Sequence, residues 1–280
     1  MKRPGAVARA LRHPSFAAGA VLSLAVLGMA LLALLWTPHP ATAIDIPNKL
    51  LGPNATHWLG TDSLGRDILS LLLVGAQNSM VVGVLAVALG MTLGVALGAL
   101  AAARGGWVDE ALMRASDFGF AFPALLIAIL LSAVHGPGLA TSVVAIALFN
   151  VPVFARITRG AAQAVWARDF VLAARAAGKG RWRITLDHVL PNIADQLIVQ
   201  ATIAFATAIL AEAALSYLGL GTQPPQPSWG RMLAEAQSQL FQAPLLALWP
   251  GLAIMVSVLG LNLLGDGLRD LLDPRLVRQR

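Results

Sequence analysis

The order of apolar and polar residues divides the chain into long hydrophobic runs separated by shorter polar segments. The runs cover residues 16–36, 79–103, 118–134, 139–154, 197–218 and 245–264. A helix needs ~20 mostly apolar residues to cross a bilayer. The third and fourth runs are short and are separated by His-Gly-Pro-Gly, a turn signal, so we expect them to form a tight helical hairpin. The pattern predicts an all-α integral membrane protein with six transmembrane helices.

The first run also has features of a secretory signal. Lys2 and Arg3 precede it, and Ala41-Thr42-Ala43 resembles a cleavage site. The apolar part of a signal peptide is only about 7–15 residues long, which is shorter than residues 16–36. We therefore expect this run to remain as a membrane helix.

Composition supports a lipid environment. Hydrophobic residues make up 57% of the chain and charged residues only 12%, whereas a soluble domain is about 25% charged. There is no cysteine, which excludes disulfides and thiolate metal sites.

The positive charges are distributed unequally between the polar segments. Of the 20 lysines and arginines, only three lie between runs one and two or between runs five and six: Lys49, Arg66 and Arg231. All others precede the first run, follow the sixth, or lie between runs two and three or four and five. Because basic loops stay in the cytoplasm, this predicts a multi-pass membrane protein with both termini cytoplasmic. The high pI is then a topology signal, and no nucleic-acid partner is expected.

The segment between the fourth and fifth runs is polar and basic. Residues 161–177 have helical composition, Gly178 ends that helix, and residues 181–190 form a second short helix stopped by Pro191. A DNA-binding helix-turn-helix does not fit a segment tethered at both ends to membrane helices. A docking element for a cytoplasmic partner fits better, because small alanines allow close approach and arginines supply ion pairs.

This segment resembles the EAA loop of ABC importer permeases. Ala173, Ala174, Gly178, Leu190 and Pro191 keep the spacing of that motif. Leu172 stands where the family has glutamate, and His188 stands at a usually aliphatic position. The ATPase-coupling residues that the resemblance implies are Ala173, Ala174, Arg175, Gly178, Lys179, Arg181, His188, Leu190 and Pro191.

Three further stretches resemble the dipeptide, oligopeptide and nickel branch of the same family. They cover residues 57–67, 215–230 and 262–274. Together with the loop, they are similar to the second (C-type) permease of a type I importer. The resemblance implies a location in the bacterial cytoplasmic (inner) membrane. It also makes an outer block a candidate dock for a binding protein, and the alternative is that this block only closes the bundle. The outer block consists of Trp58, Asp62, Arg66, Asp67 and Trp229.

The resemblance also implies the partners. The chain lacks a phosphate-binding Gly-x-x-x-x-Gly-Lys-Ser/Thr motif, so ATP and Mg²⁺ would be bound by two separate ABC ATPase subunits. A second homologous permease would complete the pathway, and a periplasmic or extracellular substrate-binding protein would deliver di- or oligopeptides. Nickel, free or chelated, is the alternative substrate.

The same resemblance divides the chain into three parts. Residues 1–78 hold a cytoplasmic tail, the first membrane helix and a periplasmic segment. Residues 79–268 form the permease core with the coupling loop 155–195 as a helix-turn-helix hairpin. Residues 269–280 form a cytoplasmic tail.

Five residues are candidates for the pathway or for helix packing. Gly90, Gly94 and Gly98 share one helix face, which serves plain packing or a sliding contact. Glu212 is either part of a proton relay or, as we favour, a helix-end carboxylate near the outer interface. Asn262 is expected to bond a neighbouring helix.

No catalytic or metal centre is expected. The five histidines are scattered over loops and termini without close pairing, whereas a metal site needs several ligands together. Two other classes of membrane protein remain open. A secondary transporter would need internal repeats and midplane polar groups, and a membrane scaffold would need no ATPase.

Overall fold

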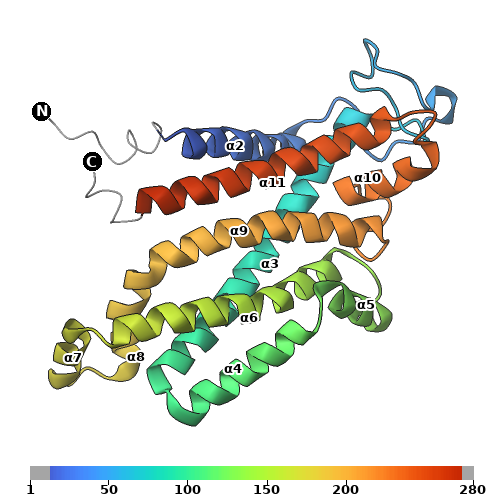
Figure 1. Ribbon diagram of the computed structural model, residues 1–280. Helices are drawn as coiled ribbons and strands as arrows, with labels where there is room; N and C mark the ends of the chain where they lie inside the picture. Colours follow the sequence, from blue (N-terminus) through green and yellow to red (C-terminus); the bar gives the residue numbers. More distant parts are fainter. Residues whose placement is uncertain (1–12, 273–280) are drawn as a thin grey trace, which may run out of the picture.

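All regular elements of the described chain are helices. The computed structural model describes residues 13–272, and its long helices lie roughly side by side (Figure 1). The long helices are α2 (Pro14–Leu35), α3 (Ile68–Arg104), α4 (Gly106–Ala121), α6 (Leu139–Trp166), α9 (Leu190–Tyr217) and α11 (Leu245–Leu272). Shorter helical elements are η1 (Ile46–Asn48), α5 (Ala124–His135), α7 (Asp169–Ala176), α8 (Arg181–Ile184), η2 (Thr185–Val189), α10 (Trp229–Ala236) and η3 (Gln237–Gln239).

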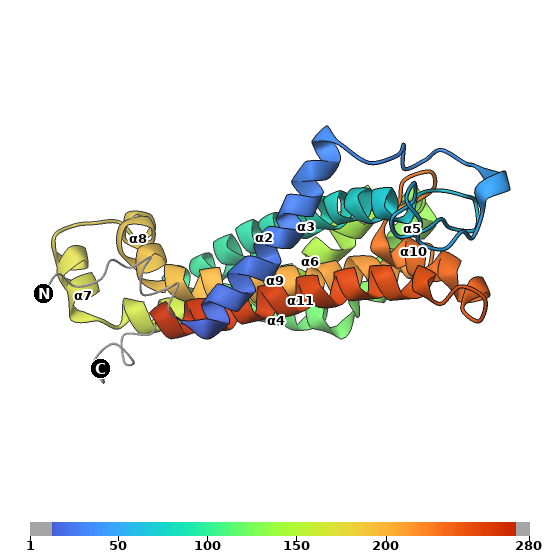
Figure 2. The same cartoon turned by 90° about the horizontal axis from the view of Figure 1, so that it is seen from above.

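The helices give the bundle two distinct ends. Figures 1 and 2 show α7 and α8 projecting from one end, with α10 and the long segment between α2 and α3 at the other. We call residues 167–189 the hairpin. We call residues 36–67 together with α10 the cap. His13 and Asp270 approach to 3.3 Å, so the described chain begins and ends near the hairpin.

The expectation of six spans is confirmed with one changed element. Five helices are long and apolar enough to cross a membrane, and α4 with α5 forms a sixth unit bent by 82°. The predicted third span, residues 118–134, is therefore not one straight helix. Phe122 is extended (φ −103°, ψ 114°) because the proline that follows it disfavours the helical conformation.

The glycines of α3 allow its close approach to α6. A Cβ atom added to Gly90 would lie 2.6 Å from Asn150 Cβ, and one added to Gly94 would lie 2.6 Å from Phe154 Cβ. Gly98 faces Thr158 in the same way, at 2.8 Å. These distances leave no space for a side chain. The three glycines pack α3 directly onto α6, as the shared helix face indicates.

Buried side chains form two hydrophobic clusters. One joins α3, α6 and α9 with the hairpin through Val171, Ile184 and Val189. The other joins α2, α3, α9 and α11 with the cap, and Trp229 is its largest fully buried member. The molecule thus anchors each end in its own part of the core.

Two predicted boundaries in the polar segment are wrong. The helix expected over residues 161–177 is divided, because α6 continues to Trp166 and α7 begins at Asp169. Pro191 does not end a helix but lies within the helical stretch Arg181–Tyr217, near the start of α9. The π-helical turn η2 joins α8 to α9 without a break.

Part of the charge argument lies outside the described residues. The basic residues within 1–12 and 273–280, and with them most of the predicted cytoplasmic tails, fall there. Arg269 still belongs to the last turn of α11.

Candidate functional site

The turn of the hairpin has the geometry that the glycine predicts. Gly178 follows α7 with φ +82°, a left-handed conformation that glycine adopts without strain. Its N–H donates to the Arg175 carbonyl at 2.9 Å, and the Lys179 N–H donates to the Ala174 carbonyl at 3.1 Å. These two bonds are the Schellman motif of a helix C-terminus. The turn therefore fixes the angle between α7 and α8.

The hairpin is anchored by few residues and leaves apolar surface uncovered. Val171 and Ile184 are fully buried. By contrast, four large side chains are exposed on its surface: Phe170 (40%), Leu172 (52%), Trp182 (59%) and Leu186 (48%). Exposed apolar groups gathered on one small element mark an interaction surface.

The polar contacts of the hairpin are exposed and loosely arranged. Lys179 Nζ lies 3.3 Å from Asp187 Oδ2 and 3.0 Å from His188 Nε2. Arg183 reaches the same carboxylate only at 3.7 Å. Arg175 and Arg181 are exposed. Such pairs contribute little to stability, so these cations remain available to a partner.

The remaining coupling candidates lie along the same element. Ala173 and Pro191 are exposed, and Ala174 and Leu190 are half-buried. Leu172, which replaces the family's glutamate, points into solvent. Seven of the nine predicted residues thus lie in the hairpin, and Leu190 and Pro191 follow directly at the start of α9.

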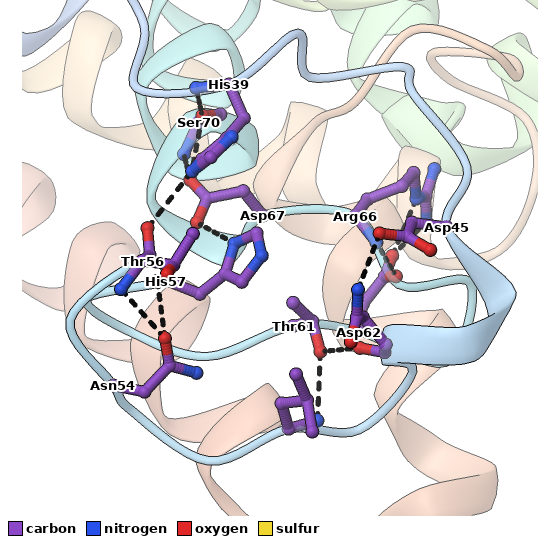
Figure 3. Close-up of polar contacts among 12 residues, drawn as sticks. His39, Asp45, Asn54, Thr56, His57, Thr61, Asp62, Arg66, Asp67 and Ser70 are labelled. Atoms are coloured by element: carbon purple, nitrogen blue, oxygen red, sulfur yellow. Dashed lines mark hydrogen bonds and ion pairs between the residues drawn. The ribbon is translucent and has the colours of Figure 1, made fainter.

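The cap is held by a buried group of charges. Asp62 Oδ1 accepts the backbone N–H groups of Leu64 (2.9 Å) and Arg66 (2.8 Å), which closes the loop (Figure 3). The Arg66 Nε donates to Asp62 Oδ2 at 2.6 Å, and its Nη2 donates to Glu235 Oε2 of α10 at 2.5 Å. Arg66 thus ties the loop to α10.

Arg66 stays charged in this setting. Its burial acts to lower the pKa of the guanidinium, but the attraction of Asp62 and Glu235 outweighs that effect and raises the pKa above its ordinary value. Loss of the proton of Arg66 therefore does not weaken these ion pairs at any pH below the ordinary pKa of arginine.

The other outer-block residues divide into buried and exposed. Trp229 is fully buried and donates its indole N–H to the Leu72 carbonyl at 3.1 Å. Asp67 is 2% exposed and caps α3 by accepting the Ser70 N–H. Only Trp58, at 60%, is free to touch a partner.

Glu212 is not solvated as a helix-end carboxylate near an interface would be. It does lie near the end of α9, but it is 0% exposed. Its carboxylate accepts the hydroxyls of Ser79 on α3 (2.9 Å) and Ser216 (2.7 Å). Burial of a carboxylate is tolerated when its oxygens are bonded in this way. Glu212 therefore joins α9 to α3 below the cap.

Asn262 also differs from the expectation. It is exposed on α11, and within residues 13–272 its amide bonds no neighbouring helix. Asn262 is therefore not one of the α11 positions that are buried against other helices, such as Leu261 and Gly265.

The sequence suggested that all five histidines are separate, but the structure brings two of them together. The rings of His39 and His57 lie 4.6 Å apart, and His57 Nδ1 is 3.0 Å from Asp67 Oδ1 (Figure 3). A ligand atom from each of the three residues lies within 4.8 Å of the others. Among residues 13–272, these three side chains therefore form one group suited to a metal ion.

Sequence reasoning missed the partners of the outer block. Glu235 lies 169 positions after Arg66, and no local pattern links them. The spacing of Arg231 and Glu235, which bond at 3.0 Å on α10, was the one available sign of a charged helix face.

Comparisons with known proteins agree with this architecture. Residues 90–278 match the family described as binding-protein-dependent transport system inner membrane component. The chain is 42% identical to the dipeptide transport system permease protein DppC of Alkalihalophilus pseudofirmus, over 92% of this chain and 85% of that one. It is 43% identical to the glutathione transport system permease protein GsiD of Pectobacterium atrosepticum, over 95% and 88%.

A solved structure shares the fold. The inward-facing MetNI methionine ABC transporter matches with a TM-score of 0.58 and 19% identity, over 75% of this chain and 95% of that chain. This likeness concerns the fold alone. From the family match and the two relatives, the chain belongs to the binding-protein-dependent transport system inner membrane components, as a permease subunit of an ATP-binding-cassette importer.

Proposed function

We propose that this chain forms half of the translocation pathway of an importer for short peptides, and that the hairpin couples it to an ATPase subunit. The observation that carries the proposal is the uncovered apolar surface of the hairpin, formed by Phe170, Leu172, Trp182 and Leu186. Membrane lipid covers the exposed apolar faces of the long helices, but the hairpin projects beyond them (Figure 2). A protein partner is therefore needed to cover it.

The charges around this surface give the partner its chemistry. Arg175, Arg181 and Arg183 are exposed on the hairpin. A groove with apolar walls and an acidic rim would complement the hairpin, because rim charges steer association while the apolar centre supplies affinity. In an importer of this family the partner is an ATPase subunit, which binds ATP and Mg²⁺.

The hairpin end then faces the cytoplasm. The basic residues gathered there support this orientation, and it places both chain termini inside. The cap faces the periplasm or the cell exterior, where a substrate-binding protein delivers the substrate. Trp58 is the exposed aromatic residue that this partner would touch.

The relatives support a peptide substrate. The two relatives compared are named for dipeptides and for glutathione, and both compounds are short peptides. A nickel chelate is the alternative that the sequence left open, and the experiment below includes it.

Transport by the reconstituted complex tests both parts of the proposal. The chain, its second permease, the two ATPases and the binding protein are placed in liposomes, and ATP-dependent uptake of a dipeptide, glutathione and a nickel chelate is measured. We expect uptake of at least one peptide. Uptake of the nickel chelate alone would overturn the substrate assignment.

Two tryptophan variants test the hairpin. Trp182→Ala removes the largest exposed side chain of the hairpin, and Trp107→Ala removes an even more exposed tryptophan at the start of α4. Truncation of an interface tryptophan costs more than about 1.4 kcal/mol, or tenfold in affinity. We expect Trp182→Ala alone to weaken ATPase binding at least tenfold. Equal binding by the two variants would contradict docking through the hairpin.

A further inference from the structure

The cap contains a cluster of metal-binding side chains drawn from three separate stretches. His39 follows α2, His57 lies in the loop, and Asp67 is the N-cap residue of α3. Figure 3 shows the two rings and the carboxylate turned toward one another. Since the three ligand atoms lie within 4.8 Å of each other, a small rearrangement brings them around one ion.

Two of the three side chains are shielded from solvent, and His39 is half-buried. The side chain of His57 is 13% exposed and that of Asp67 only 1%. Within residues 13–272 the carboxylate of Asp67 pairs with no lysine or arginine, because its contacts are His57 and Ser70. A buried carboxylate is stabilised by a cation, and a metal ion between the carboxylate and two imidazoles would supply that charge.

The spacing fits a tetrahedral ion. His57 Nδ1 and Asp67 Oδ1 are 3.0 Å apart. Two ligands of a tetrahedral Zn²⁺ with bonds of about 2.0–2.1 Å lie roughly 3.3 Å apart. The hydrogen bond that now joins the two atoms can thus be exchanged for two metal bonds with a shift of a few tenths of an ångström.

The surrounding bonds resemble the outer shell of a metal site. The carbonyl of Thr56 lies 3.0 Å from His39 Nε2 and orients that ring. The Ser70 hydroxyl donates to Asp67 Oδ2 at 2.7 Å and the Ser70 N–H at 2.8 Å, which leaves Oδ1 for the ion. Ligating histidines and carboxylates are usually held by such partners.

We propose that His39, His57 and Asp67 bind one first-row divalent transition-metal ion of the Zn²⁺ type. Two imidazoles and one carboxylate suit such an ion better than Mg²⁺ or Ca²⁺, which prefer oxygen ligands alone. The ion is resident and is not the transported solute. It ties the segment after α2 to the start of α3, and a tie that closes a long loop restricts the unfolded chain most.

Zinc titration of the assembled complex tests the site. The complex is purified through a tag without histidine, freed of metal with a chelator, and titrated with Zn²⁺ by calorimetry. His39→Gln removes one imidazole but keeps a donor for the Thr56 carbonyl. His135→Gln, at an exposed histidine outside the cluster, is the matched control.

We expect one site per chain that His39→Gln weakens at least tenfold, because even outer-shell partners are worth about 10- to 100-fold. His135→Gln should bind as the unaltered chain does. We also expect Zn²⁺ to raise the unfolding temperature of the unaltered complex more than that of His39→Gln. Equal affinity in the unaltered complex and His39→Gln would overturn the proposal.

Chemical modification of the unaltered complex gives a test that needs no variant. Diethylpyrocarbonate modifies accessible histidines, and mass spectrometry locates the modified residues. We expect Zn²⁺ to protect His39, the most exposed residue of the cluster, and to leave His135 reactive. Unchanged modification of His39 with saturating Zn²⁺ would contradict the site.

Discussion

The cap and the hairpin lie at opposite ends of the same helices and hold their charged residues differently. In the cap, the side chains of Arg66 and Asp62 are 9% and 11% exposed and are 2.6 Å apart. In the hairpin, Lys179 and Asp187 are 36% and 42% exposed and are 3.3 Å apart. The first ion pair is shielded from water, whereas the second ion pair is partly exposed to it.

The apolar residues show the same contrast. Trp229 of the cap is fully buried and bonded, whereas Trp182 of the hairpin is 59% exposed. A buried group rigidifies the structure around it, and an exposed aromatic side chain gains its packing only from a partner. The comparison teaches that the cap is internally complete and that the hairpin is built for contact.

Trp229→Ala should cause the largest loss of stability. Removal of a fully buried tryptophan costs about 3–5 kcal/mol, and here it also leaves the Leu72 carbonyl without its donor. Thermal unfolding of the purified chain in detergent measures the effect. Trp182→Ala serves as the control and should unfold within about 0.5 kcal/mol of the unaltered chain. Similar losses for both variants would remove the contrast between cap and hairpin.

Arg66→Met should cost less, on the order of 3 kcal/mol, because it leaves the buried carboxylate of Asp62 without a cation. Glu235 is less affected, because it is partly exposed and still pairs with Arg231. The matched substitution in the hairpin is Arg183→Met, which breaks an exposed pair with Asp187 and should change stability by less than about 0.5 kcal/mol. The same thermal unfolding assay applies. A stable Arg66→Met chain would show that the charges of the cap are not structurally important.

Much of the fold was predictable, because membrane helices are specified by local composition. Two of the apolar runs, 16–36 and 245–264, agree with α2 and α11 to within a few positions, except at the C-terminal end of α11. The spacing of Gly178 from the alanines also identified the hairpin turn, since a Schellman motif is local. Local signals of this kind need no knowledge of distant contacts.

The wrong helix boundaries arose at two prolines that have opposite effects on the helix. Pro123 interrupts a span because the residue before it becomes extended. Pro191 instead lies within one continuous helical stretch, just after the π-helical turn η2. The sequence around either residue does not decide between these outcomes, which depend on what packs before the proline.

The cap was the least predictable region, because its contacts join residues far apart in the chain. His39 and His57 meet only after the segment between α2 and α3 folds back onto Ser70. Just below the cap, the buried carboxylate of Glu212 accepts a hydrogen bond from the hydroxyl of Ser79, which lies 133 positions before it. Single-residue patterns carry no sign of such pairings.

Gly178→Pro should have the smallest effect on stability and the largest on coupling. Proline fixes φ near −65°, whereas the native φ is +82°, and it also removes the N–H that bonds Arg175. The turn is exposed, so the helices should still insert and unfold nearly as before. Gly178→Asn, which tolerates the left-handed conformation, is the matched control.

The most direct measurement is the number of substrate molecules imported per ATP hydrolysed, in liposomes containing the complex with either Gly178→Pro or Gly178→Asn. We predict that Gly178→Pro inserts normally but imports at least tenfold less substrate per ATP, while Gly178→Asn remains close to the unaltered complex. Normal import per ATP by the proline variant would contradict coupling through the hairpin.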